Sequence, residues 1–297
     1  MDKPKSVGGQ AVIEGVMMKG LHTVVAVKKK DGKIAVKKIN DKSWGLIEKI
    51  PFIRGFFVLL HAMIVGMGAL SYSAKMSGEE EEDFTKKDMI IAIVMAFLVA
   101  SLGFGALPVI LIKPFNIQNE FWFAFFEGVI RAVIVIAYIW GISLLKDIKR
   151  IFEYHGAEHK SVFTYEKGLD LTVENAKDFT TLHPRCGTSF MIITVFASII
   201  VFAISGALGF TGIVEKIISR IILLPLVAGV AYEFQKFTAK IINNPVGKVL
   251  AYPGLMLQKI TTSQPDKDQL KIALISLRYS LDSNFEGETE VNPDDFE

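Results

Sequence analysis

The chain has 297 residues, of which 51% are hydrophobic, and its formal net charge at pH 7 is +2. So apolar a composition is rare in soluble globular proteins and favours an integral membrane protein, while the nearly neutral charge gives no reason to expect a nucleic-acid partner. The single cysteine excludes an internal disulfide and gives no sign of an oxidising compartment.

Residues 1–50 predict a small β-rich region on the cytoplasmic side. The run VVAVKKKDGKIAVKKI alternates apolar and basic residues around Asp31 and Gly32, and an Asp-Gly pair is typical of the tight primed turn of a β-hairpin. The preceding run VGGQAVIEGVMMKG is rich in glycine and predicts strand or loop with close backbone approach. Glu14 in that run is a reserve metal ligand; the alternative is that it stabilises a turn.

Four apolar segments approach the length of about 20 residues that crosses the hydrocarbon core of a bilayer. They are residues 89–112, 128–145, 190–210 and 217–234. They form two predicted membrane hairpins, residues 75–145 and 190–235. A fifth segment, residues 55–71, is short and contains His61 and several glycines. As a span it would leave lysine and arginine abundant on both membrane faces, so we predict that residues 51–74 are interfacial or re-entrant.

The positive-inside rule then puts both termini in the cytoplasm, together with the loop of residues 146–189 and an amphipathic region of residues 236–281. Residues 282–297 are acidic and predicted to be disordered, and the acidic run of residues 79–83 is a solvated loop. The predicted fold is therefore mainly α: a polytopic helical bundle in the plasma membrane, with about four spans, one interfacial or re-entrant helix, a small N-terminal β-hairpin region and cytoplasmic amphipathic helices.

Glu127 and Arg131 have the i, i+4 spacing of a helical ion pair near the start of the second span. An ionisable pair inside a membrane is a functional candidate by default. The alternative, which the aromatic run FWFAFF favours, is an interface belt from which the side chain of Arg131 extends to the lipid headgroups.

The strongest chemical signal is FEYHGAEHK, in which His155 and His159 are four residues apart. On a continuing helix they share one apolar face, and imidazoles at that spacing can bind one cation. The same run has the H-x-x-E-H pattern of inverted zincins, in which the histidines bind zinc and the glutamate, here Glu158, activates a bound water. Zn²⁺ is the cofactor that this pattern predicts.

The run LHPRCGT adds two donors, His183 and Cys186, directly before the third span. With His155 and His159 they make a candidate tetrahedral set, in which three ligands leave a position for water and four close a structural site. A metal-free alternative stays open: Arg185, with the free N–H groups of Gly187 and Thr188 at the start of the membrane helix, would bind an anion such as a lipid phosphate. The histidines would then be hydrogen-bonding groups that close the loop.

The chain resembles the YqhQ family of bacterial membrane proteins over nearly its whole length up to the acidic tail. The runs that carry the resemblance are GGQAVIEGVMMKG, FEYHGAEHKSVFTYEKG, LTVENAKDF, LHPRCGTSF, PFIRGFF, LLPLVAGVAYEF and PGLMLQKITT. The resemblance implies a multi-pass plasma-membrane protein of Gram-positive and related bacteria. Members of that family form a domain family of unknown function and are labelled predicted metal-dependent enzymes, a label that rests on the same histidine pattern.

Two functions are open at this point. The first is a metal-dependent hydrolase that acts on a membrane peptide or a lipid headgroup, with Glu158 as general base. The second is a non-enzymatic membrane module, a scaffold for protein insertion or assembly or a handler of lipids or ions, in which the histidine cluster is structural. Both predict the lipid bilayer as a partner, a membrane protein or a lipid as a further one, and no nucleic acid.

Overall fold

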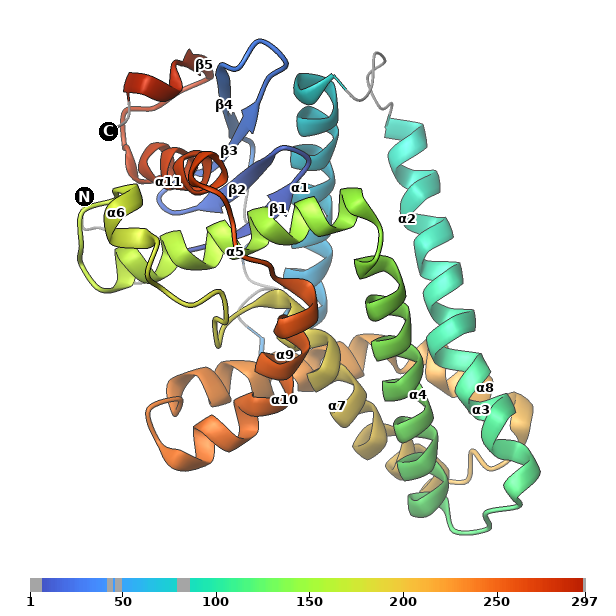
Figure 1. Ribbon diagram of the computed structural model, residues 1–297. Helices are drawn as coiled ribbons and strands as arrows, with labels where there is room; N and C mark the ends of the chain where they lie inside the picture. Colours follow the sequence, from blue (N-terminus) through green and yellow to red (C-terminus); the bar gives the residue numbers. More distant parts are fainter. Residues whose placement is uncertain (1–6, 42–44, 46–49, 79–85, 296–297) are drawn as a thin grey trace.

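The computed structural model describes residues 7–41, 45, 50–78 and 86–295, so the acidic run of residues 79–83 lies outside the described residues. A β-sheet covered by helices on both faces lies beside a layer of apolar helices, and α5 separates the two layers (Figure 1). The functional candidates lie where these two layers meet.

The sheet is antiparallel and has the order β1-β2-β3-β4-β5. Its strands are β1 (Gly8–Val12), β2 (Gly15–Lys19), β3 (Thr23–Lys28), β4 (Ile34–Ile39) and β5 (Glu288–Val291). The predicted hairpin is confirmed as β3 and β4, but the turn differs from the primed type. Within the described turn between β3 and β4, only Gly32 has a left-handed backbone conformation, with φ 85°. The N–H of Lys29 donates to the carbonyl of Lys33 at 2.9 Å. A longer loop closed by a left-handed glycine avoids the positive φ that a primed turn would impose on Asp31 as well.

The acidic tail does not match the prediction of disorder, because residues 288–291 form β5 and pair with β4. Charge explains the pairing: Lys37 lies 3.2 Å from Glu288, and Lys38 lies 2.7 Å from Glu286. The basic face of the hairpin is thus matched by acidic residues from the other end of the chain. Because β1 and β5 belong to one sheet, they lie on the same side of any membrane that the helices cross.

Helices cover both faces of the sheet. One face packs against α1 (Ile53–Ser77), with Ala69 and Tyr72 in the interface. The other face packs against α5 (Lys146–Glu166) and α11 (Lys267–Leu281), with Tyr154 and Leu277 fully buried. The short helix α6 (Val173–Ala176) follows α5, and the Thr172 hydroxyl caps it by accepting from the N–H of Asn175 at 3.3 Å.

The apolar layer contains the other α-helices that the structure describes, together with two short helical turns. They are α2 (Lys86–Ala100), a π-helical turn (Ser101–Ala106), α3 (Leu107–Ile112), a 3-10 turn (Lys113–Phe115), α4 (Glu120–Ser143), α7 (Gly187–Ala207), α8 (Ile213–Ile222), α9 (Leu224–Lys240) and α10 (Pro245–Thr261). Within the described residues, four helical stretches are long and apolar enough to cross a membrane. They are Ile53–Ser77, Ile90–Phe115, Glu120–Ser143 and Gly187–Ala207.

The segment expected to be interfacial or re-entrant is one unbroken helix, α1, whose 25 residues extend about 37 Å at 1.5 Å per residue. Its first turn packs on α9, where an added Cβ on Gly55 would come 2.9 Å from the Cα of Gly229. Its last turns pack on the sheet. The helix therefore has the length of a span, but about half of it covers the sheet.

The expected span at residues 217–234 is instead divided into α8 and α9, with the break at Leu223. Pro225 in the first turn of α9 explains the break, because proline lacks the N–H that would continue the helix. The second expected span also shifts: α4 begins at Glu120, where Asn119 caps it by accepting from the N–H of Trp122 at 3.1 Å.

Candidate metal centre

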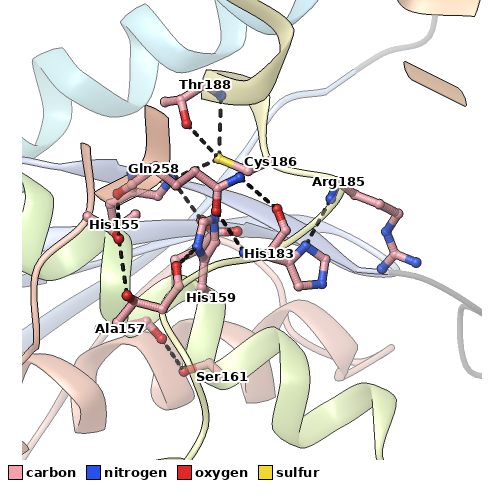
Figure 2. A network of polar contacts seen from close by, with 12 residues as sticks. His155, Ala157, His159, Ser161, His183, Arg185, Cys186, Thr188 and Gln258 are labelled. Carbon is pink, nitrogen blue, oxygen red and sulfur yellow. Dashed lines mark hydrogen bonds and ion pairs between the residues drawn. The ribbon is translucent and has the colours of Figure 1, made fainter. Parts of the chain in front are cut away.

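Helix α5 carries His155 and His159 on the side that faces the start of α7 and the end of α10 (Figure 2), and Glu158 directly precedes His159 on the same helix. It is a separate helix from α4, because the chain turns at Leu144 and Leu145 before α5 begins. The spacing of four residues puts the two imidazole rings on one stripe, with ring centroids 4.4 Å apart. This part of the sequence prediction is confirmed.

Three donor atoms converge between α5 and the start of α7. The Nε2 atom of His155 lies 3.1 Å from the Sγ of Cys186, and the ligand atoms of His155, His159 and Cys186 all lie within 4.8 Å of one another. The carboxylate of Glu158 borders the group: its Oε2 is 3.6 Å from Nε2 of His159 and 3.9 Å from Nε2 of His155. Two imidazoles and a thiol in this arrangement are a donor set suited to Zn²⁺.

Backbone carbonyls orient both imidazoles. The Nδ1 of His155 lies 2.7 Å from the carbonyl of Thr261, and the Nδ1 of His159 bonds to the carbonyl of Thr181. A neutral histidine that donates Nδ1–H to a carbonyl presents a lone pair on Nε2, which is how metal-binding histidines are commonly held. The Nε2 of His159 is buried and has no hydrogen-bond partner among the described residues. A cation would satisfy this atom, so the residues present fit a metal ion.

Cys186 is the N-cap of α7, and its Sγ lies 3.4 Å from the N–H of Thr188 and 3.1 Å from the Thr188 hydroxyl. The sulfur is therefore held at the N-terminus of α7, where it faces the Nε2 of His155.

Gln258 of α10 holds the loop that brings Cys186 to α5. Its side chain is fully buried, accepts from the N–H of His183 at 2.7 Å, and donates to the carbonyl of His183 at 2.8 Å and to the Ser189 hydroxyl at 2.7 Å. Sequence reasoning missed this residue. The available signal was one glutamine among the apolar residues of PGLMLQKITT, and its partner lies 75 residues away.

Burial shifts the pKa values of Glu158 and His159 in opposite directions. It raises the pKa of Glu158, although His155, His183 and the backbone N–H of Gly9 act in the opposite direction. Burial lowers the pKa of His159, against the effect of Cys186. A neutral imidazole can bind a metal ion, and a carboxylate with a raised pKa is a stronger base.

His183 lies outside the group of three donors. Its Nδ1 accepts from the N–H of Arg185 at 3.3 Å, and its Nε2 faces Oε2 of Glu166 at 3.4 Å. Its ring centroid is 5.6 Å from that of His159. The structure thus brings together three of the four predicted ligands, and His183 stabilises the loop instead.

The structure does not bring Arg185 together with the other groups of the predicted anion site. Its guanidinium pairs with Glu166 and points away from Thr188 (Figure 2). Gly187 is the first residue of α7, and the N–H of Thr188 is used by the sulfur of Cys186. The charge of Arg185 and the N–H of Thr188, which the anion-site interpretation requires, are therefore already engaged.

Glu14 also lies away from the donors. It pairs with Arg150, and its carboxylate lies 3.2 Å from the hydroxyl of Tyr154. Its backbone has φ 50° in the turn between β1 and β2. The alternative role, stabilising that turn, matches this position.

The pair Glu127 and Arg131 is buried in the apolar layer, so the interpretation as an interface belt is wrong for these two side chains. Glu127 is fully buried and pairs with Arg131 and with Arg220 of α8, whose Nε lies 3.1 Å from Oε1 of Glu127. Arg131 also donates to the carbonyl of Phe104 at 2.7 Å and to the Ser198 hydroxyl. Sequence reasoning missed Arg220, which lies 93 residues after Glu127.

Comparisons with known proteins agree on one family. The family described as "Protein of unknown function (DUF1385)" matches residues 50–283. The "Uncharacterized protein YqhQ" of Bacillus subtilis (strain 168) is 33% identical over 299 residues, which cover 94% of this chain and 93% of that protein. No solved structure matches.

Proposed function

The chain belongs to the DUF1385 family of proteins of unknown function, and from this premise we propose that it is a membrane-bound, zinc-dependent hydrolase. His155, His159 and Cys186 hold the metal ion, and Glu158 is the general base. The site acts at the cytoplasmic membrane face, on a membrane peptide or a lipid headgroup.

The observation that carries this proposal is the arrangement of lone pairs. The buried Nε2 of His159 lacks a hydrogen-bond partner among the described residues, and it lies within 4.8 Å of two further donor atoms. Three protein ligands leave one position open on zinc, as in catalytic rather than structural sites. Bound zinc would lower the pKa of a water in that position toward ~7. Glu158, 3.6 Å from Nε2 of His159, is close enough to accept the proton.

Metal content tests the ligand set. Protein purified in detergent and dialysed against Zn²⁺ should hold one zinc ion per chain by elemental analysis. His155→Ala and Cys186→Ala should each lose that zinc, because two ligands hold it poorly. His183→Gln is the matched control: it is a buried loop residue outside the donor group, and zinc should stay bound. Wild-type protein without zinc would overturn the proposal.

The role of Glu158 is tested by Glu158→Gln. The amide keeps the shape of the side chain and cannot accept the proton, so zinc should stay bound while hydrolysis falls by about 10²–10⁴-fold. Hydrolysis is measured with fluorogenic peptides and with a fluorogenic phospholipid, both in mixed micelles. Full activity in Glu158→Gln contradicts the assignment of this residue as the base.

A structural metal site is the second candidate, and burial favours it. His155 is 9% exposed, Glu158 and Cys186 are 6% exposed, and His159 is 1% exposed. If Glu158 is a fourth ligand, the set is closed to water and the protein is a non-enzymatic membrane module. Glu158→Gln would then weaken zinc binding, so one variant separates the two functions.

A further inference from the structure

The first strand of the sheet, β1, has an open edge beside the candidate metal centre. It is the end strand of the order β1-β2-β3-β4-β5, and no other strand of the described residues pairs with it besides β2. We propose that an extended peptide binds along this edge by backbone hydrogen bonds and is the substrate of the site. This inference rests on the proposed hydrolase function.

The direction of the backbone groups supports the inference. The N–H of Gly9 acts on the carboxylate of Glu158, so it faces α5 and not β2. Directions alternate along an antiparallel strand, so the N–H and C=O of Ala11 point the same way as those of Gly9. The carbonyl of Gly9 and both backbone groups of Ala11 are the hydrogen-bonding row that a peptide strand would complete.

The edge is also accessible. Gly9 and Gln10 are exposed, and a Cβ added to Gly8 would meet no atom within 4 Å. Small side chains leave the backbone of this strand uncovered, although α5 runs beside it (Figure 1). A second backbone can therefore approach β1.

The opposite edge of the same sheet shows the usual protection. Strand β5 carries Glu288 and Glu290 and is followed by Pro293, and charges and proline are the common means of preventing strand addition. The sequence of β1, GGQAV, has no charge, no proline and no bulge in its pairing with β2. An edge strand that lacks these protective residues is suited to binding a further strand.

Position connects this edge to the chemistry. A Cβ added to Gly9 would come 2.9 Å from Cγ of Glu158, so the edge passes directly beside the proposed base. A row of N–H and C=O groups recognises any extended polypeptide backbone, whereas a lipid headgroup has no repeating amides to pair with it. In the hydrolysis, the oxygen of water bonds to the carbonyl carbon of the substrate, the C–N bond breaks, and the proton accepted by Glu158 passes to the leaving amine.

Two zinc-binding probes test the edge separately from the metal. Acetohydroxamate contacts only the metal ion, while the hydroxamate of an extended Val-Val-Ala tripeptide also presents a backbone to β1. Binding is measured by calorimetry on the zinc-loaded full chain in detergent. The tripeptide should bind roughly tenfold or more tightly than acetohydroxamate, which corresponds to one or two net hydrogen bonds. N-methylation of the amides of the tripeptide should abolish this difference.

Variants of Ala11 locate the effect on the protein. Ala11→Pro removes one outward N–H, which edge strands tolerate, and should reduce tripeptide binding about tenfold while acetohydroxamate binding is unchanged. Ala11→Ser keeps the N–H and should bind like wild type. If Ala11→Pro does not fold, the N-methylated probe decides with wild-type protein.

The outcomes are distinguishable. Equal binding of the tripeptide, its N-methylated form and acetohydroxamate to zinc-loaded protein overturns the inference about the edge and leaves the metal site in place. Absence of zinc, and therefore of acetohydroxamate binding, overturns the proposed function first. Hydrolysis of the phospholipid but not of any peptide also overturns the inference.

Discussion

At the scale of single residues, the candidate centre depends on groups that hold the donors rather than on the donors alone. The carbonyls of Thr181 and Thr261 select the tautomer of the two histidines, and Gln258 positions the loop that presents Cys186. Such partners restrict a ligand to the orientation that binds metal and commonly affect metal affinity as strongly as a ligand does.

Replacing Gln258 tests this dependence. Gln258→Leu keeps the volume but leaves the N–H and the carbonyl of His183 without their partner in a buried position, which should cost about 2–4 kcal/mol of folding stability. Zinc affinity should fall as well, because the loop carries Cys186. Thermal unfolding and zinc titration in detergent measure both effects. Gln235→Leu is the control: Gln235 makes one bond, to the carbonyl of Cys186 at 2.9 Å, and should cost about 1 kcal/mol or less.

Glu14 and Arg150 predict a pH effect away from the metal. Burial alone would raise the pKa of Glu14, but the guanidinium of Arg150 outweighs burial, and the pKa is lowered. A carboxyl group whose pKa is lower in the folded state stabilises the fold at pH values above its unfolded pKa of about 4.3. This stabilisation is lost as the pH falls through the folded pKa. Because Arg150 is 45% exposed, the gain is at most about 1 kcal/mol.

Arg150→Met should therefore lower the melting temperature at pH 7 by a few degrees, and this difference should shrink as the pH falls from about 4.3 through the lowered pKa of Glu14. The measurement is thermal unfolding of the two proteins from pH 7 down to the lowest pH at which both fold. A difference that stays constant over this range would show that Arg150 stabilises through packing and not through Glu14.

At the scale of elements, the sequence analysis predicted the features that depend on local periodicity. It missed the features that depend on contacts between residues far apart in the chain. The hairpin of β3 and β4 and the shared face of His155 and His159 each follow from residues within a few positions of one another. The pairing of β4 with β5 joins residues about 250 positions apart, so the tail alone looked disordered. A helix was predicted at residues 51–74, close to α1, but hydropathy did not reveal that about half of it covers the sheet.

The polar network between α4 and α8 predicts an order of stabilities. One carboxylate, Glu127, serves the guanidinium groups of both Arg131 and Arg220, and all three side chains are buried. Glu127→Leu leaves two buried cations unpaired and should destabilise the protein by about 3–5 kcal/mol or more. Arg220→Met leaves the pair of Glu127 with Arg131 and should cost less. Thermal unfolding in detergent gives the order, and a larger loss in Arg220→Met would show that Arg220 packing, not charge balance, dominates.

At the scale of the whole molecule, the donor set joins two layers. His155 and His159 belong to α5, which packs on the sheet. Cys186 is the N-cap of α7, an apolar helix of membrane-spanning length. Gln258 connects the same loop to α10. A metal ion at this junction would tie the sheet to the membrane helices, in either the catalytic or the structural role.

The sheet also constrains how the chain crosses the membrane. Because β4 pairs with β5, Asp31 and Asn284 must lie on one side, whereas Gln118, between α3 and α4, lies at the far end of the first membrane hairpin. We expect Asp31 and Asn284 in the cytoplasm and Gln118 outside.

In a Cys186→Ser background, which removes the native thiol, a membrane-impermeant maleimide applied to intact cells should label Gln118→Cys and leave Asp31→Cys and Asn284→Cys unlabelled until the cells are opened. All three positions are exposed, so lack of labelling reports the membrane and not burial. Labelling of Asp31→Cys and Asn284→Cys in intact cells, with Gln118→Cys protected, would show the opposite orientation, with the candidate centre on the outer face. Different labelling of Asp31→Cys and Asn284→Cys would contradict the five-stranded sheet itself.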